Sequence, residues 1–254
     1  MVSDINDDEL TEEQLESAIA ADETAAAASA DVSVLSDQRT PLDLGDPGDV
    51  WDDVVGQKQA IGHLRAAVAR GPVHAYLFVG PSGSTKLEAA RAFAASLMSG
   101  GETRDHRDAR LIIAGEHPDV REVQRVGASI SDEQAKEVVR VSSLAPTEGA
   151  RKVLILDEFH LLSPHGAALM LKTIEEPPES TTFIILADFV PHDLITISSR
   201  CARIDFRAIG ADVIAARLLT EGINPAGAMV ASKAALGNLD RARLFRAEPD
   251  LLHQ

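Results

Sequence analysis

The fold is decided by residues 75–87, which read AYLFVGPSGSTKL. The uninterrupted apolar run Ala75–Val79 is typical of a strand that is buried on both faces of a parallel sheet. A loop with two glycines follows and leads into a stretch whose apolar residues recur at helical spacing, namely Leu87, Ala90, Ala94 and Leu97. A strand, a glycine loop ending in lysine and a helix, in this order, predict a phosphate-binding loop.

Further apolar runs extend the predicted sheet to five strands, at residues 119–123, 153–156, 183–187 and 202–206. Helical signals lie between them. Ser131 and Gln134 form a capping box that opens a helix reaching Val141. Leu169, Met170 and Ile174 mark another helix, which ends before Pro177-Pro178. Strands that alternate with helices predict an α/β fold with a parallel sheet covered on both faces.

Strand signals stop after Phe206. Three helical segments follow over residues 211–246, with breaks at 222–225 and 237–238. This stretch is short for an independent domain, so we expect a small helical lid attached to the sheet. The predicted domains are an acidic tail at 1–49, an α/β nucleotide-binding-like domain at 50–207 and a lid at 208–254.

The acidic charge is concentrated at the N-terminus. Residues 1–50 hold fourteen acids and the single base Arg39, whereas the remaining residues hold 26 acids and 23 bases. Residues 1–49 also contain no Phe, Trp or Tyr. We expect this tail to be disordered, because so few apolar groups cannot offset the entropy lost on ordering. A short helix over residues 7–21 and docking of the tail on a partner are the alternatives.

Composition excludes several classes of protein. The single cysteine, Cys201, rules out an internal disulfide or a site with several cysteines, and as a neighbour of a strand it is expected to be buried and apolar. The histidines lack metal-ligand spacing, so no metal site is predicted. Without an apolar run of membrane-spanning length or a basic signal start, we expect a cytoplasmic protein with no membrane contact.

The predicted phosphate loop carries two unusual residues. Thr85 stands where the last glycine of such loops belongs, and Leu87 where a magnesium-binding hydroxyl belongs. A β-branched residue in a conformation suited to glycine costs about 1–3 kcal/mol, and a hydrocarbon cannot bind a hard cation. An idle loop is favoured, while weak binding of ATP or ADP stays open. The candidate phosphate-binding residues are Gly80, Pro81, Ser82, Gly83, Ser84, Thr85 and Lys86.

Two other places could contribute to phosphate chemistry. Asp157 and Glu158 end an apolar strand, where one carboxylate can orient magnesium and the next can activate water. Both have suitable identities, but with a defective loop they could be idle. Arg200, just before the last strand, could be solvated, could pair with an acid or could project across a subunit interface.

Together these residues resemble the AAA+ clamp-loader subunits, most closely the delta-prime subunits of bacterial DNA polymerase III. The resemblance covers residues 53–245. Its landmarks are Val55-Gly56-Gln57, Gly80-Pro81-Ser82-Gly83, His117-Pro118-Asp119-Val120, Leu171-Lys172-Thr173-Ile174-Glu175-Glu176-Pro177-Pro178 and Ser199-Arg200-Cys201.

The resemblance implies a part in placing the sliding clamp on primed DNA. Arg200 would serve as an arginine finger in the ATP site of a neighbouring subunit, which suits a chain whose own site does not hydrolyse ATP. Asp188 falls where catalytic relatives carry a polar sensor, and Arg241 matches the sensor region of the lid loosely. Implied partners are gamma/tau-type and delta-type subunits, the sliding clamp, and DNA through the assembled ring only. The nearly neutral body favours no direct DNA binding, although a basic strip of Arg121, Arg125, Lys136 and Arg140 is an alternative.

The sequence departs from this family in three respects. The region after the first helix, residues 99–103, lacks the cysteines of the family's zinc module, so zinc is not expected. The family's C-terminal collar is not expected within these 254 residues, which indicates a reduced subunit or a truncated chain, and the acidic tail is no part of the family pattern. Two other hypotheses stay open: the protein is a competent ATPase of the gamma/tau type, or it is an AAA+ adaptor outside the loader.

Overall fold

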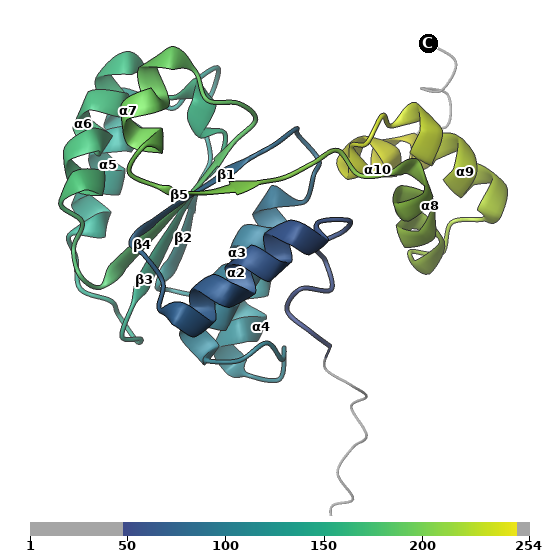
Figure 1. Ribbon diagram of the computed structural model, residues 1–254, viewed down its shortest axis with the longest axis horizontal. Coiled ribbons are helices and arrows are strands. Elements are labelled where there is room, and N and C mark those ends of the chain that lie inside the picture. The colour runs from purple at the N-terminus through teal and green to yellow at the C-terminus, as the bar shows by residue number, and fades with distance from the viewer. Residues whose placement is uncertain (1–47, 248–254) are drawn as a thin grey trace, which may run out of the picture. The chain divides into compact units, whose positions relative to one another are not determined.

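The computed structural model describes residues 48–247, with side chains as far as Phe245 (Figure 1). The predicted disorder of residues 1–49 and the possible helix at 7–21 concern residues that lie, apart from 48 and 49, outside this described part.

Five parallel strands form one sheet in the order β2-β3-β4-β1-β5. Every strand expected from the sequence is present, with ends shifted by at most two residues. The strands are β1 (Ala75–Val79), β2 (Val120–Val123), β3 (Lys152–Leu156), β4 (Thr181–Ala187) and β5 (Ala202–Asp205). The predicted α/β fold with five parallel strands is therefore confirmed.

Helices cover both faces of the sheet (Figure 1). On one face lie α2 (Lys58–Arg70), α3 (Lys86–Ser99) and α4 (Arg107–Ala114), and on the other lie α5 (Asp132–Ser142), α6 (Pro164–Glu175) and the short α7 (Ile195–Ser198). Side chains of β1 alternate between two cores: Tyr76 and Phe78 join the first, and Leu77 joins the second. Burial on both faces explains why the central strands β1, β3 and β4 read as nearly continuous apolar runs, whereas the edge strands β2 and β5 carry exposed charged residues. Single-turn 3-10 helices at Phe159–Leu161 and His192–Leu194 complete this part.

Helices α2 and α4 were not expected from the sequence. Helix α2 begins without a side-chain cap and buries only Ala60 and Leu64. Helix α4 is eight residues long and buries only Ala109 and Ile112. Both helices nevertheless have an apolar face, since Ile61 and Val68 of α2 and Ile113 of α4 also pack against the core, so their helical periodicity was present in the sequence.

Three helices follow the sheet: α8 (Ala211–Thr220), α9 (Pro225–Ala234) and α10 (Leu239–Ala247). We refer to them as the C-terminal helices. They surround a separate hydrophobic core that includes Ile214, Leu218 and Leu239. Val55, which precedes α2 in the chain, also belongs to this core. The breaks between them contain Gly222 and Gly237, both with φ of 85°, a left-handed conformation that glycine adopts without steric cost.

Hydrogen bonds join the C-terminal helices to the rest. Arg207 lies in the segment that leads from β5 to α8. The side-chain amide of Gln57 donates to the backbone carbonyl of Arg207 at 2.7 Å and accepts from its backbone amide at 3.1 Å. At the start of α10, the amide of Leu239 donates to the carbonyl of Gly83 at 3.0 Å. The helices are therefore fixed directly to the predicted phosphate loop.

Candidate functional site

The predicted phosphate loop lies between β1 and α3 and has a tightly turned backbone. Gly83 has φ of 68°, and Thr85, immediately before α3, has φ of 61° and ψ of 32°. Thr85 thus adopts the left-handed conformation that a glycine would favour. Its hydroxyl donates to the carbonyl of Ser84 at 2.7 Å and lies 3.4 Å from the carbonyl of Val55. The threonine is accommodated with strain in a loop that keeps its turn.

Lys86 is buried under this loop, with 8% of its surface exposed. Its ammonium group lies 2.9 Å from a carboxylate oxygen of Asp188, which directly follows β4. It also donates to the carbonyls of Gly80 and Pro81. The lysine expected to bind phosphate is therefore already neutralised and hydrogen-bonded by the protein itself.

The loop opens on a cavity of about 270 Å³ with an acidic lining. The loop and α3 contribute Ser82, Gly83, Thr85, Lys86 and Leu87 to the wall. The remaining wall consists of five carboxylates, those of Glu88, Asp157, Glu158, Asp188 and Asp240. Because one cation faces five acids, the electrostatic field in this cavity opposes the entry of a phosphate anion.

Two of these acids are shifted toward their neutral forms. Burial raises the pKa of Glu88, and repulsion by Asp240 adds to that rise. Burial is also the main cause that raises the pKa of Asp157, opposed by a hydrogen bond from the Glu158 amide and reinforced by the Glu158 charge. Asp188 is the carboxylate of this lining that pairs directly with Lys86.

The structure brings the two acids after β3 into this same cavity, as their position predicts. Asp157 accepts the amide of Glu158 at 2.8 Å. Glu158 has φ of 49° and pairs with Arg125 at 2.6 Å. Among the residues at the cavity, Leu87 offers no ligand for a metal ion, and the ammonium group of Lys86 is paired with Asp188.

Arg200 lies apart from the cavity lining. Its guanidinium is 2.7 Å from a carboxylate oxygen of Glu175, at the end of α6, and donates to the carbonyl of Thr196 at 2.8 Å. Its side chain is 37% exposed. In this chain the arginine is therefore held at the surface by an acid, and the structure does not bring it together with Lys86, Asp157 or Glu158.

The residue of the C-terminal helices that reaches the cavity was not expected from the sequence. Arg241 is not part of the cavity wall, and its guanidinium lies 5.4 Å from the ring centre of Phe245. The preceding residue, Asp240, lines the cavity instead. No sequence signal could have singled out Asp240 or Glu88, because ordinary acidic residues on helices are usually solvated.

The landmark at residues 117–120 has a structural role in this chain. Asp119 is 1% exposed, and its carboxylate accepts the amides of Thr147, Glu148 and Gly149. The ring of His117 accepts the amide of Asp119 at 3.0 Å. This cluster closes the loop between α5 and β3.

Cys201 is partly buried, and desolvation raises the pKa of its thiol to about 12. It is therefore protonated and a poor nucleophile at neutral pH. Among the described residues, no group of three or more His, Cys, Asp or Glu side chains could hold a metal ion.

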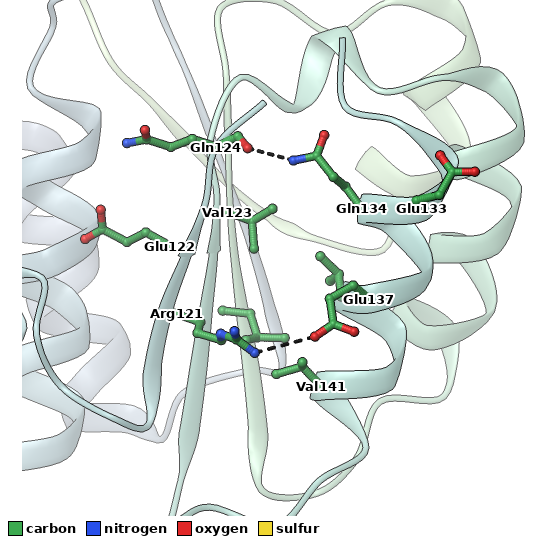
Figure 2. Close-up of a pocket in the computed structure, with 10 residues that line it drawn as sticks. Arg121, Glu122, Val123, Gln124, Glu133, Gln134, Glu137 and Val141 are labelled. Atoms are coloured by element: carbon green, nitrogen blue, oxygen red, sulfur yellow. Dashed lines mark hydrogen bonds and ion pairs between the residues drawn. The ribbon is translucent and has the colours of Figure 1, made fainter. Parts of the chain in front are cut away.

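A second hollow, of about 400 Å³, lies between the edge strand β2 and α5 (Figure 2). Figure 2 shows Arg121 pointing toward Glu137 across its mouth, with 3.7 Å between their charged atoms. Arg140 also pairs with Glu137, at 2.7 Å, and Arg125 pairs with Glu158. Three of the four bases of the possible DNA-binding strip thus have carboxylate partners, which weakens that alternative.

No helix within residues 48–247 has the length and apolar character that crossing a bilayer requires.

Comparison with known proteins connects this geometry to a family. The tau subunit of DNA polymerase III from Bacillus subtilis is 36% identical over 175 residues, which cover 66% of this chain and 31% of that protein. The delta' subunit from the same organism is 32% identical over 156 residues, covering 60% of this chain and 47% of the relative. The chain therefore spans between about a third and a half of these curated relatives.

Solved structures support the fold. The RuvB Holliday junction branch migration motor of Thermotoga maritima superposes with a TM-score of 0.53 at 21% identity, over 82% of this chain and 66% of that one. This likeness concerns the fold alone, and it agrees with the predicted AAA+ architecture. Residues 56–210 match the family model described as "DNA polymerase III, delta subunit". The strand-loop-helix unit, the acids after β3 and this match together show that the chain belongs to the DNA polymerase III delta subunit family.

Proposed function

We propose that this protein is a delta-prime-like subunit of the DNA polymerase III clamp loader, which places the sliding clamp on primed DNA. In this proposal its own nucleotide site is idle, and it lends Arg200 to the ATP site of a neighbouring subunit. The proposed partners are gamma/tau-type and delta-type subunits and the sliding clamp. DNA is contacted only through the assembled ring, and the place of action is the cytoplasm.

One observation carries the idle-site part of the proposal. Lys86, the cation of the phosphate loop, is buried and paired with Asp188 inside a cavity lined by five carboxylates. Phosphate binding would have to displace Asp188 and overcome the remaining negative charge. The hydrocarbon at Leu87 adds the lack of a magnesium ligand.

The surface position of Arg200 supports the other part. An arginine that serves a neighbouring subunit has to lie outside the cavity of its own chain and within reach of a partner. Arg200 lies outside the cavity lining with 37% of its side chain exposed, and in this proposal its ion pair with Glu175 is exchanged for a phosphate in the neighbouring site. Because both side chains are more than a third exposed, that pair contributes little stability, and breaking it costs about 0–1 kcal/mol.

The decisive experiment is Arg200→Ala in a loader reconstituted with gamma/tau-type and delta-type subunits from the same cells. We expect normal assembly but a fall in DNA-stimulated ATP turnover, by roughly tenfold or more at the one site that Arg200 serves. The matched control is Arg203→Ala, since Arg203 is also exposed and pairs with Asp205 two residues along. Unchanged turnover by a fully assembled Arg200→Ala loader would contradict the role in trans.

A second candidate is a catalytic subunit of the gamma/tau type, favoured by the 36% identity to the tau subunit. Magnesium-dependent ATP turnover by the isolated chain would support this candidate against the idle-site proposal. An adaptor outside the loader is tested by purifying the protein from its own cells and identifying the bound proteins by mass spectrometry. Absence of the other clamp-loader subunits would support the adaptor reading.

A further inference from the structure

We propose that Asp188 is the residue that excludes phosphate from the loop, because its carboxylate takes the place on Lys86 that a nucleotide phosphate would otherwise occupy. This inference rests on the idle nucleotide site proposed above and adds its cause. In this inference Thr85 and Leu87, the two unusual residues of the loop, are secondary causes of the idle site. The ligand class that the loop would admit without Asp188 is a diphosphate, free or as part of a nucleotide.

The loop itself has kept a backbone suited to an anion. Gly83 and Thr85 both adopt the left-handed conformation, so the chain still turns tightly before α3. Helix α3 is 14 residues long, and Thr85 at its N-terminus makes no side-chain cap. The first amides of a helix attract an anion when no side chain caps them.

Lys86 is the residue of this loop whose charge is paired within the protein and so is not free for a phosphate. At 8% exposure its ammonium group requires a counterion, and Asp188 supplies one at 2.9 Å. Asp188 is held in place because its amide donates to the ring of His160 at 3.3 Å and its position at the end of β4 is set by the sheet. An incoming phosphate would have to compete with the Asp188 carboxylate for the ammonium group of Lys86. It would also be repelled by that carboxylate at contact distance.

The other four acids of the cavity act on phosphate less directly. Glu158 pairs with Arg125, and Asp240 lies 3.6 Å from Arg243, so both charges are partly balanced. Neither Glu88 nor Asp157 is among the partners of the Lys86 ammonium group, and burial raises the pKa of both carboxyls. Asp188 is thus the acid of this wall whose removal both subtracts a charge and releases the lysine.

The test is Asp188→Asn in the full chain, which removes the charge and keeps the shape. The probes are ADP and inorganic pyrophosphate, titrated without magnesium by calorimetry, so that any gain reports contacts with the protein and not with a metal ion held by Asp157 or Glu158. We expect Asp188→Asn to bind both probes about ten- to a hundredfold more tightly than the natural chain. Pyrophosphate separates recognition of the diphosphate from recognition of the base.

Three control variants make the result specific. Asp188→Glu keeps a carboxylate beside Lys86 and should show no gain. Asp240→Asn removes the same formal charge from the same cavity without releasing Lys86, and should change affinity less than about threefold. Adding Lys86→Met to Asp188→Asn should abolish the gain. Circular dichroism confirms folding, and a rise in melting temperature with ADP provides a second readout for any variant that is destabilised.

Each outcome bears on a different claim. If the natural chain binds ADP poorly and Asp188→Asn binds no better, the role of Asp188 is refuted while the idle site stands. An equal gain from Asp240→Asn would also refute it, since general charge would then be the cause. Tight binding of ADP by the natural chain would overturn the idle site and this inference together.

Discussion

At the scale of single residues, one buried carboxylate organises a whole loop. Asp119 accepts three amides, and these bonds outweigh the effect of burial and hold the pKa of its carboxyl below its usual value. The carboxylate therefore replaces the water that these amides would bind in the unfolded chain. Charge-assisted hydrogen bonds of this kind are among the stronger ones in proteins.

We expect Asp119→Asn to lower the free energy of unfolding by about 3 kcal/mol at pH 7, because a buried acceptor charge is lost and an NH₂ group faces backbone donors. Since folding depresses the pKa of Asp119, its stabilisation is complete above the ordinary aspartate pKa and disappears as the pH falls through the lowered value. The difference between variant and natural chain should therefore shrink below about pH 4.

Denaturant unfolding over a range of pH measures this effect. Asp105→Asn serves as the control, since the Asp105 side chain is 78% exposed. A difference between the Asp119 variant and the natural chain that stays constant down to pH 2 would contradict the assignment.

At the scale of elements, α5 shows how a helix is fixed at both ends. The capping box predicted from the sequence is present: the Ser131 hydroxyl accepts the Gln134 amide at 3.3 Å, and the Gln134 side chain accepts the Ser131 amide at 3.2 Å. At the other end the buried ammonium group of Lys152 donates to the carbonyls of Val141 and Leu144. The second cap comes from β3 and has no local sequence signal.

We expect Ser131→Ala to lower the free energy of unfolding by about 1 kcal/mol, since the first turn of α5 loses its cap. Gln134→Ala should cost more, because its amide also donates to the carbonyl of Gln124 at 2.8 Å. The double variant should lose less than the sum of the two, since both bonds belong to one box.

Thermal and denaturant unfolding measure these effects. Ser143→Ala at the far end of the same helix should change stability by less than about 0.5 kcal/mol. Strict additivity of Ser131→Ala and Gln134→Ala would argue against a reciprocal box.

At the scale of the described molecule, a cluster of charged residues connects the C-terminal helices to the segment that precedes α2. Arg217 of α8 contacts Asp53 at 2.8 Å, the carbonyl of Asp52 at 3.0 Å and Glu221 at 2.8 Å. Arg104 binds Asp53 from the other side at 2.8 Å. Burial opposes ionisation of Asp53, but these two arginines hold its pKa below the usual value.

We expect Arg217→Met to loosen the C-terminal helices selectively, because it removes all these contacts while keeping the bulk of the side chain. Amide hydrogen exchange should accelerate in α8–α10 by roughly tenfold, with little change in α2 and α3. Arg203→Met, which removes an exposed arginine paired with its near neighbour Asp205, is the control. Equal acceleration over the whole chain would show that this cluster has no local role.

Much of the fold was predictable because its signals are local. Apolar residues marked all five strands, in nearly continuous runs in β1, β3 and β4 and interrupted by charged residues in β2 and β5, and the capping box and the Gly and Pro breaks marked the helices that carry them. Helices α2 and α4 were missed although both are amphipathic: α2 begins without a side-chain cap, and α4 spans only eight residues and is capped by His106, which is not one of the usual capping residues. The cavity was predictable in part: the loop and the acids after β3 stand at strand ends, which meet at one edge of a parallel sheet.

The sequence alone determined the strand-loop-helix unit, the two unusual residues of the loop and the acids that face it, since each depends on neighbours in the chain. Only the tertiary structure decided which charge meets Lys86. Asp188 lies 102 residues further along, and it reaches the lysine because the sheet order sets β4 beside β1. Asp240 arrives from α10, whose first residue, Leu239, donates its amide to the carbonyl of Gly83. An electrostatic partner is chosen by distance in space, and that distance exists only after the strands have been ordered.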